Sequence, residues 1–325
     1  MLFRSLVLNI LIVARGIAGG IEKASKILMP TLFLLLILLC IRSITLSGAS
    51  GGIEFLFKPD FTKVTGKTVL AALGQAFFSL SLGMGCMITY GSYLRKEEKL
   101  PSNAFVVTAM DTGISLLAGL AIFPALFAFG MKPAAGPGLV FVVVPSIFAQ
   151  MGTLGLLFSA VFFIALTVAA LTSSVSLLEV VVAYLMDQRK MSRKPSVFLS
   201  SAIMVVMCIF SSLSLGVMSG FKILGVGVFD FFDILTDKIF LAIGGMLLAI
   251  FAGWFLKKEE LQNELTNEGT ISFRLFGIWY HLIKYIIPVA IAVVAIMGIA
   301  SIQQTGVMIF GLSVIVVLGL FSKKL

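Results

Sequence analysis

Long blocks of apolar residues follow one another along the chain, and they limit the folds open to it more than any other feature. A helical stretch of about 20 apolar residues spans the hydrocarbon core of a bilayer. The blocks are Leu2–Ala14, Ile27–Leu46, Val69–Tyr93, Ala104–Gly130, Leu154–Met186, Val197–Leu215, Phe229–Leu256, Trp279–Ile302 and Val307–Phe321. The first block is too short to span and the last is marginal. We therefore expect an all-α, polytopic transmembrane helix bundle.

The composition supports a single membrane domain over residues 1–325. Hydrophobic residues make up 59% of the chain and charged residues 12%, whereas soluble domains carry about 25% charged residues. The blocks lack the alternation of a membrane β-barrel. Cys40, Cys86 and Cys208 all lie inside apolar blocks, and His281 is the one histidine. These residues form no metal-binding motif and no nucleophile–base pair, so we do not expect an enzyme.

The basic residues predict the orientation of the chain. The net charge is +9, which on a soluble protein would suggest nucleic acid, but here the charges sit in short loops. One set of loops carries Arg15, Lys23, Lys26, Arg95, Lys96, Lys99, Arg189, Lys190, Arg193, Lys194, Lys257, Lys258, Arg274, Lys323 and Lys324. The opposite set carries Arg42, Lys58, Lys63, Lys67, Lys132 and Lys222. The excess predicts a multi-pass inner-membrane protein with a cytoplasmic C-terminus and no nucleic-acid partner.

One loop differs from the others. Residues 131–152 are rich in Gly and Pro and yet include the apolar stretch Leu139–Phe148. That stretch is too short to cross a bilayer. We expect a hairpin-like extracellular loop that folds onto the protein as a lid, as loops over binding sites do.

The block Val69–Tyr93 contains polar residues and glycines that lipid would not favour. Gln75, Ser79 and Ser81 precede Gly83 and Gly85, and each glycine weakens a helix by about 1 kcal/mol relative to alanine. An unwound stretch here would free backbone carbonyls to bind a cation and a zwitterion. The alternative is that small residues permit close helix packing.

A polar stripe runs along the block Leu154–Met186. Ala169, Thr172, Ser173, Ser176 and Glu179 fall on one helical face. The two adjacent hydroxyls and the carbonyl of Ala169 offer three oxygen ligands to a hard cation such as sodium. The alternative is that the hydroxyls bond to carbonyls of their own helix.

Several acidic residues lie in or beside the blocks. Asp111 is in the middle of one, where a carboxylate costs about 2.5–3.5 kcal/mol on insertion scales. Such residues usually face a cavity or a partner and are functional candidates. Asp230 and Asp233 lie at the outer end of another block, where a surface role is an equal alternative. Asp187 ends a block beside a basic loop, and the alternative there is a simple surface ion pair.

Taken in order, these motifs resemble the sodium:neurotransmitter symporter family, and in particular its bacterial amino-acid transporters of the LeuT fold. The matching segments cover residues 15–33, Phe-Lys-Pro-Asp-Phe at 57–61, Gly-Gln-Ala-Phe-Phe-Ser-Leu-Ser-Leu-Gly-Met-Gly at 74–85, Ile-Thr-Tyr-Gly-Ser-Tyr at 88–93, Leu-Thr-Ser-Ser at 171–174 and Ser-Arg-Lys at 192–194. The match weakens after about residue 300. The resemblance places Leu2–Ala14 in the fourth helix of that fold. The chain would then hold mainly the second inverted repeat plus the C-terminal helices.

The resemblance also implies site residues. Ala169, Thr172 and Ser173 match one sodium site, and Ser79 and Asp111 match part of a second. The substrate pocket is matched by Phe78, Ser81, Met84 and Leu177. Chloride, which some members require, is a further candidate ion, with ligands matching Gln75, Ser79 and Ser115. Asp233 and Asp187 match the acidic halves of an outer and an inner gate. The family usually has Asn where this chain has Asp111, which changes the charge at that site.

The function implied is sodium-driven symport of an amino acid by alternating access. The first three helices of the family fold, which would complete both sodium sites, have no counterpart in this sequence. We therefore expect the chain to be inactive alone. The alternative is a non-transporting membrane subunit or relic that needs a second chain carrying the missing helices, and such a chain is a further candidate partner.

Overall fold

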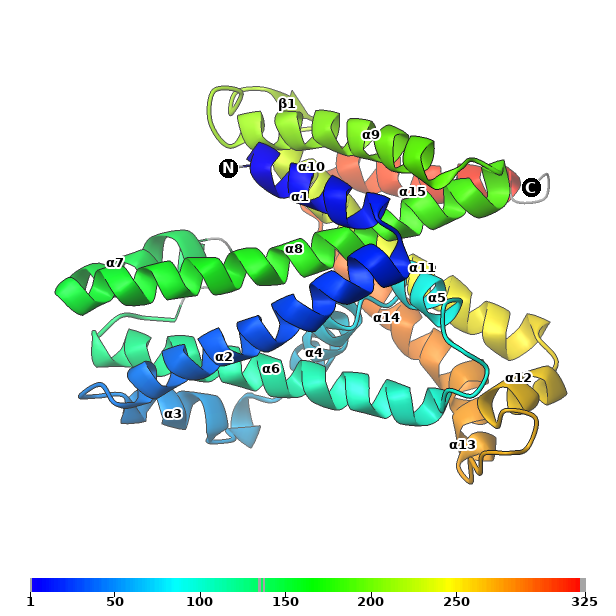
Figure 1. The fold of residues 1–325 in the computed structure, drawn as a ribbon, viewed down its shortest axis with the longest axis horizontal. Helices are drawn as coiled ribbons and strands as arrows, with labels where there is room; N and C mark the ends of the chain where they lie inside the picture. Colours follow the sequence, from blue (N-terminus) through cyan, green and yellow to red (C-terminus); the bar gives the residue numbers. More distant parts are fainter. Residues whose placement is uncertain (1, 134–135, 137, 322–325) are drawn as a thin grey trace. The chain divides into compact units, whose positions relative to one another are not determined.

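The computed structural model describes residues 2–133, 136 and 138–321, and most of these residues are helical (Figure 1). Within this part of the chain, six helices are long and apolar enough to cross a membrane. They are Ile17–Ile44, Leu100–Ala128, Thr153–Arg189, Arg193–Ser214, Val228–Phe255 and Phe276–Ala300. Ser5–Ala14 and Thr305–Val317 are apolar but shorter. The predicted all-α membrane bundle is confirmed.

Contacts divide the chain into two units, which are described separately. The first comprises Met1–Lys63, Val106–Leu178 and Ser192–Val197, and the second comprises Val64–Phe105, Glu179–Met191 and Phe198–Leu325. Three long helices contribute residues to both units, namely α6 (Leu100–Ala128), α8 (Thr153–Arg189) and α9 (Arg193–Ser214).

The first unit packs short and long helices around an apolar core. Its further elements are α1 (Leu2–Ala14), the π-helical turn η1 (Ile17–Glu22), α2 (Lys23–Ile44), α3 (Ser50–Phe57), the 3₁₀ turn η2 (Phe61–Lys63), the π-helical turn η3 (Leu139–Val143) and α7 (Val144–Gln150). Leu39 of α2 packs with Phe148 of α7 and Phe162 of α8. The hydroxyl of Ser43 accepts a hydrogen bond of 2.8 Å from the buried amide of Ala125. That bond satisfies a backbone group which bilayer lipid could not satisfy.

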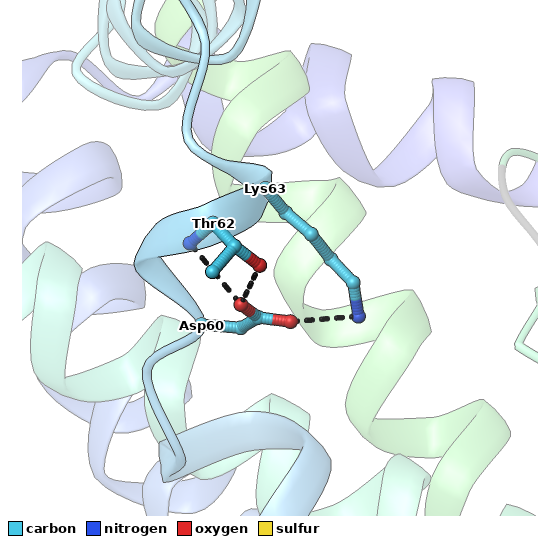
Figure 2. Close-up of polar contacts among 3 residues, drawn as sticks. All are labelled: Asp60, Thr62 and Lys63. Atoms are coloured by element: carbon cyan, nitrogen blue, oxygen red, sulfur yellow. Dashed lines mark hydrogen bonds and ion pairs between the residues drawn. The ribbon is translucent and has the colours of Figure 1, made fainter.

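The loop after α3 carries the Phe-Lys-Pro-Asp-Phe motif and is ordered by one carboxylate (Figure 2). Asp60 accepts hydrogen bonds from the backbone amide of Thr62 at 3.2 Å and from its hydroxyl at 2.5 Å. The ammonium of Lys63 lies 3.0 Å from the second carboxylate oxygen. The Thr62 hydroxyl first, and Lys63 after it, hold the pKa of Asp60 below its ordinary value. The motif therefore has a local structural role.

The second unit contains the broken helix and the C-terminal helices. Its elements are α4 (Gly66–Ser79), α5 (Cys86–Gly91), β1 (Lys222–Ile223), β2 (Val226–Gly227), α10 (Val228–Asp233), η4 (Ile234–Phe240), α11 (Leu241–Ile250), η5 (Phe251–Phe255), α12 (Lys258–Leu265), α13 (Phe276–His281), η6 (Leu282–Ile286), α14 (Ile287–Ala300) and α15 (Thr305–Phe321). Here η4, η5 and η6 are π-helical turns. Ala242 of α11 packs with Ile291 and Ala295 of α14, and Val307 of α15 packs with Ile239.

The structure adds elements that the apolar blocks did not predict. Residues 139–150 are helical, with Val144, Ile147 and Phe148 buried, within the loop for which the sequence predicted a hairpin-like form. The predicted lid over 131–152 stays a prediction, and residues 134, 135 and 137 of it lie outside the described part. The strands β1 and β2 pair antiparallel, with Lys222 opposite Gly227.

Candidate functional site

The helix predicted over Val69–Tyr93 is interrupted in its middle. α4 ends at Ser79 and α5 begins at Cys86, and Figure 1 draws them as separate helices. Between them, Ser81, Gly83 and Gly85 have φ values of 53°, 81° and 82°. Glycine adopts this left-handed region freely, whereas a serine there is strained. The unwound stretch predicted from the sequence is confirmed.

The same stretch also packs closely against α11, as the alternative interpretation required. A Cβ atom at Gly83 would collide with the carbonyl oxygen of Leu241 and lie 2.8 Å from the backbone nitrogen of Gly245. The two interpretations are therefore compatible. Glycine permits the unwound conformation and lets that backbone rest on the next helix.

Three of the expected sodium ligands meet within one turn of α8. The hydroxyls of Thr172 and Ser173 both donate to the carbonyl oxygen of Ala169, at 2.9 and 3.2 Å. These bonds to a carbonyl of the same helix are the ones that the alternative interpretation predicted. They also bring the two hydroxyl oxygens and the carbonyl oxygen of Ala169 close together. The donor set fits a hard cation, which would take the lone pairs of all three oxygens. On binding, the two hydroxyl protons would turn away from Ala169.

Close to this turn, a buried amide of α1 pairs with a hydroxyl of α8, a contact that sequence reasoning missed. Asn9 of α1 is 2% exposed; its side chain accepts a hydrogen bond from the Ser174 hydroxyl and donates to the carbonyl of Ser5, both at 3.0 Å. The signal was available, because Asn9 is an amide inside an apolar block. The pair fixes α1 beside the Thr172 turn.

The remaining expected ligands come from both units. Ser79 ends α4 in the second unit, whereas Asp111 and Ser115 lie on α6 in the first, where Asp111 is half-buried and Ser115 exposed. Phe78 is 51% exposed in the second unit and Leu177 is 46% exposed in the first. The joint use of these residues in one ion or substrate site stays a prediction.

A cavity of about 400 Å³ in the second unit lies beside α4. Gln75 and Phe78, which the sequence singled out, line it, together with residues of η4, α11 and α14. Ser81 and Met84 are not among its lining residues. Sequence reasoning missed its charged members, which are Lys67, Asp237 and Lys238. The ammonium of Lys238 donates to the Ser301 hydroxyl at 3.2 Å.

The two expected gate residues are exposed. Asp233 ends α10 and Asp187 lies in the last turns of α8. A deeper acid on α8, Glu179, is 0% exposed and accepts a hydrogen bond of 2.8 Å from the hydroxyl of Tyr93. Glu179 thus pairs with another side chain of the bundle, that of Tyr93. Among the described residues, no cluster of His, Cys, Asp and Glu could hold a metal ion.

Comparison with known proteins gives one consistent result. The family model described as "Sodium:neurotransmitter symporter family" matches residues 1–316. An uncharacterised sodium-dependent transporter of Bacillus subtilis, YhdH, is 40% identical over 287 residues, which are 88% of this chain and 63% of that protein. A similar transporter of Haemophilus influenzae is 40% identical over 291 residues, covering 89% and 63%. The sodium-dependent nutrient amino acid transporter 1 of Drosophila melanogaster is 34% identical over 199 residues, covering 58% and 31%.

One solved structure extends the comparison to the fold. The crystal structure of MhsT in complex with L-phenylalanine has a TM-score of 0.79 and is 44% identical, covering 90% of this chain and 66% of MhsT. MhsT is a LeuT-fold transporter. The chain thus spans about three fifths of the length of the bacterial relatives that it matches.

Proposed function

The chain belongs to the sodium:neurotransmitter symporter family, and from that premise we propose that it takes part in sodium-coupled symport of an amino acid by alternating access. One observation carries the proposal. The second unit contains a helix that is unwound at mid-length, and the first unit contains a turn of α8 where two hydroxyls converge on one carbonyl. Carbonyls and hydroxyls held in this way are ligands for sodium in ion-coupled transporters.

Sodium binding at the α8 turn would exchange hydrogen bonds for ion contacts. The hydroxyls of Thr172 and Ser173 lose their bonds to Ala169, and each such bond contributes only about 1 kcal/mol. An ion contact to each oxygen outweighs that loss. A small cost of this kind suits a transporter, since the ion must also leave on the other side. The second sodium would use Ser79 and Asp111.

The substrate we propose is an apolar amino acid. The carbonyl end of α4 carries partial negative charge, which favours an ammonium group. Phe78, Met84 and Leu177 offer apolar side chains, and Ser81 adds a hydroxyl. MhsT holds L-phenylalanine and the Drosophila relative is named as an amino acid transporter, which supports this class. Gln75, Ser79 and Ser115 remain candidates for chloride, and replacing chloride by gluconate during uptake tests that role.

We also propose that the protein lies in the inner membrane with Lys257, Lys258 and Arg274 on the cytoplasmic side. The support is the excess of basic residues in the loops on that side. The outer gate would then use Asp233 and the inner gate Asp187.

A chimera tests the proposal. The segment of MhsT that lies outside the match is joined in front of this chain, and uptake of labelled L-phenylalanine is measured in proteoliposomes. We expect uptake that depends on an inward sodium gradient. Thr172→Val should raise the sodium concentration for half-maximal uptake by roughly tenfold or more, since even indirect partners of metal ligands contribute that much.

Thr167→Val is the matched control. Its hydroxyl donates to the carbonyl of Phe163 at 2.7 Å on the same helix, so the substitution removes a similar bond away from the proposed site. Equal sodium dependence in both variants would exclude a sodium site at Thr172. The chain without the added segment forms a second arm, and sodium-dependent uptake above empty vesicles there would disprove the expectation that it is inactive alone.

A further inference from the structure

A lysine side chain lies among aromatic rings at one end of two membrane helices. Lys284 belongs to η6, inside the helix Phe276–Ala300. Its ammonium is 5.0 Å from the ring centre of Trp254, 5.4 Å from that of Tyr280 and 5.8 Å from that of Tyr285. We call these four residues the Lys284 cage. The face of each ring attracts the cation electrostatically.

Backbone contacts hold the cage in place. The indole N–H of Trp254 donates to the carbonyl of Lys284 at 2.9 Å. A Cβ atom at Gly253 would lie 2.7 Å from the Cα atom of Lys284, so only glycine allows η5 and η6 to approach this closely. The crossing of two helices therefore positions the backbone of Lys284, and its ammonium donates to the hydroxyl of Tyr280 at 3.4 Å.

A second cation shares the cage. The ammonium of Lys258 lies 5.6 Å from the centre of the same Tyr280 ring. In the described part of the chain, neither Lys258 nor Lys284 has an ion pair with a carboxylate. Lys257 is different, since its ammonium lies 3.7 Å from Glu260. Two ammonium groups thus lie beside the same Tyr280 ring, each without an ion-pair partner among the described residues.

The cage is open to its surroundings, and apolar side chains adjoin it in sequence. Trp254 is 58% exposed and Tyr285 is 51% exposed. Phe255, Ile278 and Ile286 are exposed as well. Tryptophan and tyrosine collect at the depth of lipid headgroups, and basic pockets between membrane helices bind anionic headgroups there. A water-soluble anion has no acyl chains to bury against these exposed apolar side chains.

We propose that the Lys284 cage binds the headgroup of an anionic phospholipid, with phosphate oxygens accepting hydrogen bonds from Lys258 and Lys284. The acyl chains lie against the exposed apolar residues next to the cage. Such a site would link the lipid composition of the cytoplasmic leaflet to the packing of η5 against η6. None of its residues is among those assigned above to ions, substrate or gates.

Tryptophan fluorescence gives a direct test, because the chain has 2 tryptophans, Trp254 and Trp279. In a Trp279→Phe background, the purified chain is placed in phosphatidylcholine nanodiscs. Brominated phosphatidylglycerol or brominated phosphatidylcholine is added at equal mole fraction, and quenching of Trp254 gives their relative association constants. We expect a clear preference for phosphatidylglycerol.

Lys258→Gln should lower that preference about fivefold, since each basic residue near an anionic surface contributes about that factor. Lys258→Gln combined with Lys284→Gln should lower it further.

Lys257→Gln is the matched control, because Glu260 already pairs with Lys257, and it should keep the preference of the parent. Lys258 is exposed, so Lys258→Gln remains informative even where Lys284→Gln impairs folding. Equal quenching by the two lipids in the parent would overturn the proposal. So would an unchanged preference in Lys258→Gln, or full displacement of brominated phosphatidylglycerol by inorganic phosphate, which would indicate an ion site.

Discussion

At the scale of single residues, the contact between Tyr93 and Glu179 is a sensitive point in the second unit. Glu179 is fully buried and the Tyr93 hydroxyl donates to it. Tyr93→Phe removes that donor, which should cost about 1–2 kcal/mol and lower Tm by roughly 2–6 °C. Thermal unfolding in detergent measures the shift. Tyr184→Phe, at a half-exposed tyrosine of α8, should change Tm little, and an equal drop in both variants would contradict the expectation.

Asp60 predicts a pH dependence for the loop after α3. Its pKa is lowered in the folded chain, mainly by the Thr62 hydroxyl and then by Lys63. A lowered pKa means that the carboxylate stabilises the loop at neutral pH, and that this stabilisation is lost as pH falls through the lowered value, below about 3.9. Hydrogen exchange of the peptide around Thr62, corrected for intrinsic rates, should accelerate over that range.

Asp60→Asn should show the faster exchange already at neutral pH, because the amide cannot pair with Lys63. Glu54→Gln removes the ion pair between Glu54 of α3 and Lys58, the residue that follows α3, and is the control. Unchanged exchange in Asp60→Asn would mean that the hydrogen bonds of Thr62 do not order the loop.

The hydroxyls of α8 show how far residue-level prediction can go. Thr172 and Ser173 were chosen from the sequence, and Thr167 on the same helix also donates to a carbonyl one turn earlier. Polarity alone cannot distinguish an ion ligand from a hydroxyl that only donates a hydrogen bond to a carbonyl of its own helix. The difference in the structure is that two hydroxyls share the carbonyl of Ala169, and adjacency in sequence was the signal for it. The role of Asn9 depends on a tertiary contact with Ser174. No pattern in the block that contains Asn9 could identify that partner.

At the scale of elements, the break between α4 and α5 depends on Gly83. Gly83→Ala introduces a Cβ at positive φ and pushes it into the carbonyl of Leu241. We expect a loss of about 2–5 kcal/mol in the free energy of unfolding, measured by thermal or denaturant unfolding.

Gly74→Ala is the control within α4, where the added Cβ would make an ordinary contact of 3.7 Å with Val294. Because alanine favours a helix, this variant should be as stable as the parent or more so. If Gly74→Ala lowered the free energy of unfolding more than Gly83→Ala does, the close approach at Gly83 would not contribute to stability.

Most helices were predictable because a bilayer requires long apolar blocks, and α1 was predicted with the bounds Leu2–Ala14 that the structure has. The missed elements are short. α7 lies in a block too short to span, and α12 is polar, so neither produces a membrane signal. The π-helical turns change only the hydrogen-bond register, which leaves no mark in hydrophobicity.

At the scale of the whole molecule, the excess of basic residues on one side predicts the orientation. In a Cys208→Ser background, Lys258→Cys should react with an impermeant maleimide only in inverted membrane vesicles, and Lys132→Cys only in right-side-out vesicles. Cys40 and Cys86 are buried and should stay unreactive. Labelling of both new cysteines from the same side would refute the proposed topology.

The contact of Gly83 with α11 has a mechanical consequence. The unwound backbone touches Leu241 and Gly245 with no side chain between them to deform. Close-packed backbones transmit displacement and absorb little of it. A rotation of the broken helix would therefore displace α11 directly. The α14 residues that pack on Ala242 of α11 would move with it.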